Sequence, residues 1–121
     1  EGLATGTILR VSGEDLALSK DSFYTTRHPR TAVGKRADGT ILLLTADGRS
    51  TEAAGVSLKE LQDIMRWLGA DYAINLDGGG STTLYVEGAS DNGVVNHPTD
   101  NRKFDNKGER KVANAILVHT K

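Results

Sequence analysis

The sequence predicts an α+β fold in which one well-formed helix packs on a mostly antiparallel or mixed sheet. Three observations lead to this prediction. Short apolar runs of strand length alternate with turn residues, one segment has helical periodicity, and no linker or internal repeat divides the 121 residues. Residues 1–121 therefore form a single domain-sized unit.

The first half of the chain supplies three expected strands. Residues 7–12 alternate weakly between polar and apolar side chains, and residues 31–35 and 40–45 flank an Asp38-Gly39 pair, a strong hairpin signal. The continuous Ile-Leu-Leu-Leu run of residues 41–44 is typical of a strand buried on both faces. We therefore expect a hairpin whose second strand lies inside the sheet.

The clearest element is a helix over residues 58–68. Ser57 is a natural N-cap, and Glu60 three residues later completes a capping box. Gly69 suits the left-handed position that ends a helix. Apolar residues at helical spacing predict one core-facing stripe, formed by Leu58, Leu61, Ile64, Met65 and Leu68.

Three more strand-like runs follow the helix. Residues 72–76 are a short buried-type strand, residues 83–87 follow a glycine-rich segment, and residues 112–119 close the chain as a β-rich run. A long polar stretch, residues 88–111, separates the last two runs. We expect these runs to add to a mostly β structure on which the helix packs.

The composition excludes several classes of function. Fifteen basic and 16 acidic residues give a formal net charge of -1, which argues against a nucleic-acid partner. No apolar run reaches the roughly 18 residues of a membrane span. The absence of cysteine excludes a disulfide framework, a thiol nucleophile and a cysteine-based zinc site.

No metal or other cofactor is indicated by the sequence. The three histidines have no ligand spacing, and they are His28, His97 and His119. A hard divalent cation held by Asp77, Asn75 or Asp47 stays open as an alternative.

The most distinctive feature is the sequence Asn-Leu-Asp-Gly-Gly-Gly-Ser-Thr at residues 75–82. Glycines 78–80 admit positive φ and close approach of a ligand to the backbone, and successive N–H groups there can form an anion-binding nest. Ser81 and Thr82 add hydroxyl groups, and Asp77 adds a carboxylate. A nucleotide phosphate loop is excluded because the lysine and the following helix are lacking. The alternative is a tight bend with an Asx turn.

Cationic segments suggest what such a loop would bind. Residues 27–36 carry four basic side chains and no acid, and residues 102–111 carry five basic against two acidic side chains. Guanidinium groups bind phosphate oxygens in bidentate fashion, which favours an anionic small molecule; the alternative is two solvated loops. Asp47, in an Asp-Gly-Arg turn with Arg49, offers a second carboxylate beside Asp77 for acid–base chemistry.

Six ordered segments together resemble the phosphodiester glycosidase family. They span residues 29–121. The segments are Arg30–Gly34, Asp47–Arg49, Gly55–Leu58, Asn75–Thr82, Val95–Asn96 and Glu109–Asn114. The resemblance implies a hydrolase of carbohydrate metabolism that cleaves a sugar-1-phosphodiester with an N-acetylglucosamine-like sugar.

The resemblance also implies roles for individual residues. Asp77 is expected to meet the oxocarbenium-like sugar or to activate water, and Asp47 is the second catalytic candidate, with the alternative that it orients Arg49. Positive charge should matter more than a strong general acid, because the leaving phosphomonoester is already a stable anion. Expected substrate- and phosphate-binding residues are Arg30, Thr31, Arg49, Asn75, Gly78, Gly79, Gly80, Ser81, Thr82, Arg110 and Asn114.

Family domains are longer before the matched part, so the resemblance implies that residues 1–121 form the C-terminal portion of a larger domain. A second chain or a missing N-terminal segment would then complete it, and the setting would be extracytoplasmic. The alternative function is a non-catalytic binding module for anionic or phosphorylated glycans. The sequence leaves open the sugar, the acceptor, retention or inversion, the metal requirement and the oligomeric state.

Overall fold

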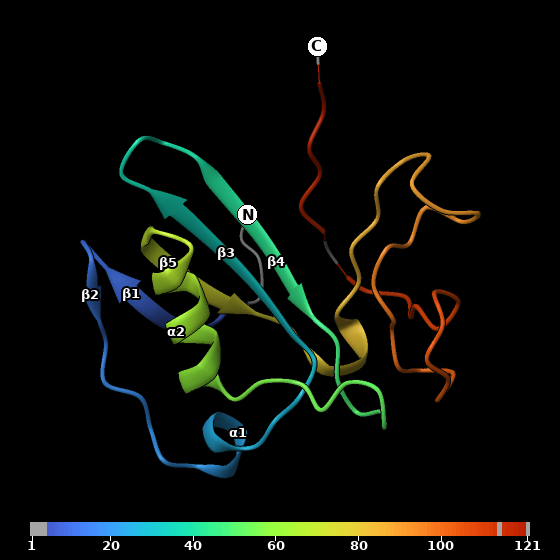
Figure 1. Ribbon diagram of the computed structural model, residues 1–121, viewed down its shortest axis with the longest axis horizontal. Helices are drawn as coiled ribbons and strands as arrows, with labels where there is room; N and C mark the ends of the chain where they lie inside the picture. The colour runs from blue at the N-terminus through green and yellow to red at the C-terminus, as the bar shows by residue number, and fades with distance from the viewer. Residues whose placement is uncertain (1–4, 114, 121) are drawn as a thin grey trace.

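The computed structural model describes residues 5–113 and 115–120. Its centre is a five-stranded sheet with strand order β2-β1-β5-β3-β4, in which each neighbouring pair is antiparallel. The strands are β1 (Thr5–Val11), β2 (Glu14–Asp15), β3 (Arg30–Arg36), β4 (Ile41–Ala46) and β5 (Ala70–Leu76). The helices are α1 (Ser22–Thr25), α2 (Leu58–Trp67) and the 3-10 turn η1 (Gly79–Ser81). The α+β prediction is confirmed (Figure 1).

Helix α2 lies across one face of the sheet and closes the core (Figure 1). The capping box is confirmed: the Glu60 N–H donates to the Ser57 hydroxyl at 3.1 Å, and the Ser57 N–H donates to the Glu60 carboxylate at 3.0 Å. The helix ends one residue earlier than expected, and Gly69 follows it with a φ of +85°. The buried apolar cluster between helix and sheet comprises Leu9, Ala32, Leu58, Leu61, Met65, Ala70 and Ala73.

The predicted hairpin is confirmed, but the burial of its second strand is not. Strands β3 and β4 pair from Arg30↔Ala46 to Lys35↔Ile41. Because β4 is an edge strand and only its alternate side chains face the core, Ile41 and Leu43 are 58% and 39% exposed. The prediction that residues 41–44 are buried on both faces was therefore wrong.

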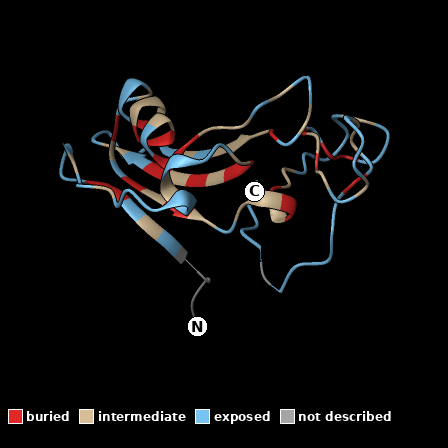
Figure 2. Cartoon of the chain, turned by 90° about the horizontal axis from the view of Figure 1, so that it is seen from below, coloured by how far each residue is buried: buried red, intermediate tan, exposed pale blue. Residues whose placement is uncertain are grey.

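The expected strands after the glycines are also absent from the described residues. Residues 83–87 contribute only an isolated bridge, Tyr85↔Val94, and the preceding turn η1 covers Gly79–Ser81. Of residues 112–119, all but residue 114 are described, and none of these forms a strand. This part of the chain winds as loops beside the end of the sheet, mostly exposed with scattered buried positions (Figure 2). Within the described chain, no helix has the length and apolar character needed to cross a membrane.

Candidate functional site

The segment Asp77–Thr82, called the glycine loop below, starts where β5 ends. Its shape is fixed by three N–H groups that donate to backbone carbonyls. Gly79 donates to Pro29 at 2.9 Å, Ser81 to Gly78 at 3.1 Å, and Thr82 to Gly79 at 3.2 Å. These three amides already donate to backbone carbonyls. They are therefore not available to an anion, and the loop is not an open nest formed by all of its N–H groups.

Two arginines pack directly on the glycine loop. A Cβ atom on Gly79 would lie 3.0 Å and 3.2 Å from the two terminal nitrogens of Arg49. A Cβ atom on Gly80 would overlap the guanidinium of Arg110 and the carboxylate of Asp100. Glycine at these two positions therefore lets two guanidinium groups approach the backbone. The structure brings together the loop and two of the three arginines that the sequence singled out.

Two carboxylates near this loop, Asp100 and Asp77, interact with the charges of its arginines. Asp100 accepts hydrogen bonds from Arg110 Nε at 2.9 Å and Nη2 at 2.6 Å. Hydrogen bonding from Arg110 holds the pKa of Asp100 below its usual value, and the charge of Arg49 adds to the effect. The pKa of Arg110 is raised chiefly by Asp100, with a further contribution from Asp77. Asp77 is exposed at the start of the loop, where a ligand can reach it.

Asp47, the second catalytic candidate, is hydrogen-bonded to a histidine. Its Oδ1 accepts the backbone N–H of His97 at 2.9 Å, and its Oδ2 lies 2.6 Å from His97 Nδ1. The His97 ring stacks on Phe104 with centroids 3.8 Å apart and an interplanar angle of 10°. The alternative was that Asp47 orients Arg49, but both of its hydrogen bonds go to His97. Asp47 is a positioning residue for His97.

Arg30 does not face the loop with its charged end. Its Nε donates to the Val56 carbonyl at 3.1 Å, and its Nη2 donates to the carbonyls of Phe23 at 2.7 Å and Thr26 at 2.9 Å. The guanidinium also lies 4.9 Å above the Phe23 ring. Burial lowers the pKa of Arg30, and the charge of Arg49 lowers it further. Arg30 joins the segment around α1 to the sheet, and its guanidinium is directed to these carbonyls instead of toward the glycine loop.

Of the remaining polar candidates, Thr31 is the one that bonds a side chain of the glycine loop. Thr31 Oγ1 bonds Thr82 Oγ1 at 3.3 Å, and the buried Thr82 carbonyl accepts from Asn96 Nδ2 at 2.8 Å. Asn75 is 1% exposed in β5, and its Oδ1 has no hydrogen-bond partner in the described structure. Ser81 closes η1. Asn114 lies outside the described residues.

His28 and Arg49 form a further contact at this end of the sheet. Arg49 Nη2 lies 3.5 Å from His28 Nδ1. Partial burial lowers the pKa of His28, and the charges of Arg30 and Arg49 lower it further. Within the described residues, no group of three or more acidic or histidine side chains is placed to hold a metal ion.

Sequence reasoning missed Asp100, His97 and Phe104. His97 was considered only for metal-ligand spacing, and its partner Asp47 is 50 residues away. Asp100 pairs with a residue ten positions later through a loop that has no periodic pattern. No local signal in the sequence could have revealed either contact.

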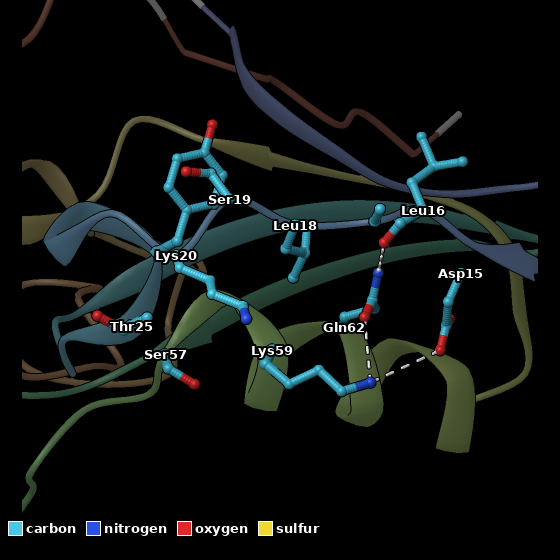
Figure 3. Close-up of a pocket in the computed structure, with 11 residues that line it drawn as sticks. Asp15, Leu16, Leu18, Ser19, Lys20, Thr25, Ser57, Lys59 and Gln62 are labelled. Atoms are coloured by element: carbon cyan, nitrogen blue, oxygen red, sulfur yellow. Dashed lines mark hydrogen bonds and ion pairs between the residues drawn. The ribbon is translucent and has the colours of Figure 1, made fainter.

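Two cavities accompany these residues, and the larger is not the one near the glycine loop. A cavity of about 610 Å³ lies between α2 and the segment before α1, and it contains none of the predicted site residues (Figure 3). A cavity of about 580 Å³ is lined by Arg49 and His97. We place the site at the glycine loop, and the smaller cavity adjoins it because Arg49 both covers Gly79 and lines that cavity.

Comparison with known proteins identifies the family that this chain resembles. A family model described as phosphodiester glycosidase matches residues 1–119. The mouse N-acetylglucosamine-1-phosphodiester alpha-N-acetylglucosaminidase is 36% identical over 103 residues, which is 84% of this chain and 19% of the relative. The chain thus spans about a fifth of that protein's length.

Two solved structures are similar to this chain in fold and sequence. The catalytic domain of the zebrafish N-acetylglucosamine-1-phosphodiester alpha-N-acetylglucosaminidase matches 76% of this chain and 33% of its own, with a TM-score of 0.63 and 25% identity. A protein of Burkholderia pseudomallei, whose export is itself a prediction, matches 66% of this chain over 15% of its own length. The TM-score is 0.57 and the identity is 47%.

Proposed function

The chain belongs to the phosphodiester glycosidase family, and we propose that its glycine loop hydrolyses a sugar-1-phosphodiester, releasing the sugar and a phosphomonoester. The observation that supports this most strongly is the packing of Arg49 and Arg110 on Gly79 and Gly80, beside the exposed carboxylate of Asp77. The proposal is made for the whole protein that carries this chain. The expectation that residues 1–121 form the C-terminal portion of a larger domain stays a prediction.

The two guanidinium groups account for phosphate binding. A phosphodiester carries one negative charge on two non-bridging oxygens, and planar guanidinium groups match that geometry. Arg110 uses Nε and Nη2 on Asp100, so its other N–H groups remain for a ligand. When the bond between the sugar C1 and the phosphate oxygen breaks, its electron pair passes to the phosphate. Arginines therefore stabilise the transition state more than the bound substrate.

Asp77 is the proposed catalytic carboxylate. Water adds to C1 as the bond to the phosphate oxygen breaks, and one water proton must leave. An ionised Asp77 stabilises positive charge on the sugar ring or accepts that proton, which then passes to the phosphomonoester. Asp77 suits this role because it directly follows the last residue of a paired strand and is exposed to a ligand.

The sugar and the location are finer parts of the proposal. The mouse and zebrafish relatives are named for N-acetylglucosamine-1-phosphodiester, and this supports an N-acetylglucosamine-like sugar here. The Burkholderia neighbour described as exported supports an extracytoplasmic setting.

The test uses the complete natural protein and N-acetylglucosamine 1-(4-nitrophenyl phosphate). Cleavage at C1 releases 4-nitrophenyl phosphate, whereas cleavage of the aryl bond releases coloured 4-nitrophenol directly, so the two reactions are distinguishable. In water labelled with oxygen-18, the label should enter the sugar. Asp77→Asn should lower kcat by about 10²–10⁴-fold.

The matched control is Asp21→Asn, because Asp21 is an exposed aspartate at α1 whose side chain makes no cap bond. It should keep full activity. Full activity in Asp77→Asn, or label in the phosphate, would refute the proposed chemistry. Salt-sensitive binding without hydrolysis would instead favour a non-catalytic binding module.

A further inference from the structure

The smaller cavity adjoins the glycine loop through Arg49, and we infer that it binds a second anionic group of the ligand held at the loop. The ligand class is then a polyanionic glycan, such as a sugar phosphate that carries a second phosphoryl group, and this naming of the substrate rests on the proposed function. The cavity, called the Arg102 pocket below, is lined by Gly48, Arg49, Ser50, Thr51, Glu52, Ala54, His97, Thr99, Arg102, Lys103 and Phe104.

The charges lining the Arg102 pocket favour an anion. Arg49, Arg102 and Lys103 contribute three positive charges against the single carboxylate of Glu52. Three acids outside the lining lie close by. Asp47 is engaged by His97. Asp100 interacts with Arg49, and Asp105 with Lys103, but Asp100 is bonded by Arg110, and Asp105 by Asn101 and the Lys107 N–H. A hollow with excess positive charge concentrates field lines and attracts anionic groups.

Backbone strain is also concentrated at this pocket. Among the described residues, three non-glycine positions have positive φ, and two of them are Arg49 and Arg102, both at +57°. Such conformations are costly for arginine and persist where the surrounding structure enforces them. The N–H of Arg102 donates to the Thr99 carbonyl at 3.0 Å, which closes the turn that carries the arginine. The two guanidinium-bearing residues therefore start from defined backbone positions at the pocket.

One wall of the Arg102 pocket suits a sugar ring. Phe104 stacks on His97, which Asp47 fixes, and Phe104 is 39% exposed. An aromatic side chain held in place by such a stack offers apolar area to the C–H face of a sugar at low entropic cost. Hydroxyl groups of Ser50, Thr51 and Thr99 line the same cavity and can bond sugar hydroxyls.

Arg49 connects the two sites, because it covers Gly79 and also lines the Arg102 pocket. A ligand bound at the glycine loop can therefore extend into the pocket along the positively charged side chain of Arg49. The larger cavity provides the contrast. Its Lys59 already lies 3.9 Å from Asp15 and 3.3 Å from the side-chain oxygen of Gln62 (Figure 3). It also pairs with Asp63 at 3.0 Å.

The inference is tested by calorimetry with two probes that differ only in a second phosphate, glucose 1-phosphate and glucose 1,6-bisphosphate. The complete natural protein should bind the bisphosphate about tenfold more tightly, a difference of about 1.4 kcal/mol. The double variant Arg102→Asn, Lys103→Gln should bind both probes with equal affinity, and its affinity for the monophosphate should be unchanged. Asparagine is chosen because it tolerates the left-handed backbone of residue 102.

The matched control is Lys20→Gln, Lys59→Gln, which removes the same charge from the larger cavity and should keep the tenfold preference. Equal affinity of the unaltered protein for both probes, or no binding of the bisphosphate, would overturn the inference. A preference that survives in the Arg102, Lys103 variant would also overturn it. Binding needs no turnover, so a protein that prefers the bisphosphate but cleaves nothing refutes only the proposed function. Hydrolysis without this preference refutes only the second anionic site.

Discussion

The chain up to Leu76 and the described chain after it are stabilised by different kinds of contact. All seven members of the apolar core cluster lie in the first region, between sheet and helix. In the second region most fully or nearly buried side chains are polar or proline, among them Thr82, Asn96 and Pro98. There, side-chain amides bond backbone groups and take the place of strand pairing. Figure 2 shows the contrast as banded red along the sheet and scattered red in the loops.

This division explains where the candidate site lies. The glycine loop leaves the sheet at the end of β5, so the first region fixes the position of Asp77 and of the bend. The second region brings Asp100 and Arg110 onto the loop, and the turn after β4 brings Arg49. Functional side chains on loops held by a packed scaffold are common in proteins, because loops can vary while the scaffold stays fixed.

The largest expected effect is the loss of core packing in the first region. Leu61 is fully buried in α2, and Leu61→Ala removes apolar contact and leaves a cavity. The free energy of unfolding should fall by about 2–5 kcal/mol, measured by denaturant titration. Trp67→Ala, at the 83% exposed position in the same helix, should change it by less than about 0.5 kcal/mol. Equal effects of the two variants would mean that the helix does not pack as described.

A smaller and local effect is expected in the second region from Asn96→Ala. The Asn96 side chain accepts from the Leu84 N–H at 2.8 Å and donates to the Thr82 carbonyl at 2.8 Å. Each backbone group left unpaired costs about 1–3 kcal/mol. Hydrogen exchange should speed up around residues 82–96 while strands β3 and β5 keep their protection. A uniform rise in exchange across the sheet would contradict a separate second region.

Gly80→Ala should separate ligand binding from stability. A Cβ atom here would meet the Arg110–Asp100 pair, and its φ is not in the positive range, so the effect is steric. The pair must move, and affinity for glucose 1-phosphate should fall about tenfold, or 1.4 kcal/mol, by calorimetry. Gly88→Ala is the control: its φ is +78° and no atom lies within 4 Å of the added carbon. It should cost some stability and leave affinity unchanged. Unaltered affinity in Gly80→Ala would remove the loop from the binding site.

The two regions also differ in how far the sequence could predict them. The helix and the hairpin were predicted because their signals are local: Ser57 with Glu60, and Asp38 with Gly39. The expected strands at residues 83–87 and 112–119 were not found in the described chain, because a β-rich composition does not say whether a partner strand is present. A tertiary contact, not a local pattern, decides whether such a run pairs.

The site shows the same limit. The triglycine and Asp77 could be selected from residue type, and Arg49 and Arg110 from the family resemblance. The structure brings the two arginines onto the loop. Arg30 could not be judged, because an arginine that bonds buried carbonyls looks the same in sequence as one that binds phosphate. The partnership of Asp47 with His97 joins segments 50 residues apart, and only the folded chain reveals it.

The smallest expected effect is a pH response of the first region through Glu60. Hydrogen bonding from Arg27, followed by the Ser57 N–H, lowers the pKa of Glu60 from 4.5 to about 2. A carboxylate with a depressed folded-state pKa stabilises the fold above its unfolded pKa, and the contribution is lost as pH falls from about 4.5 toward 2. The Glu60 side chain is 40% exposed, so solvent screening limits the contribution to below about 1 kcal/mol. Glu60→Gln should therefore flatten the fall in unfolding free energy within that window, followed by denaturant titration at several pH values. In an Arg27→Gln background the same substitution should do less, because Arg27 is the main cause of the shift. Parallel pH curves for the unaltered protein and Glu60→Gln would show that this ion pair adds nothing to the stability of the helix start.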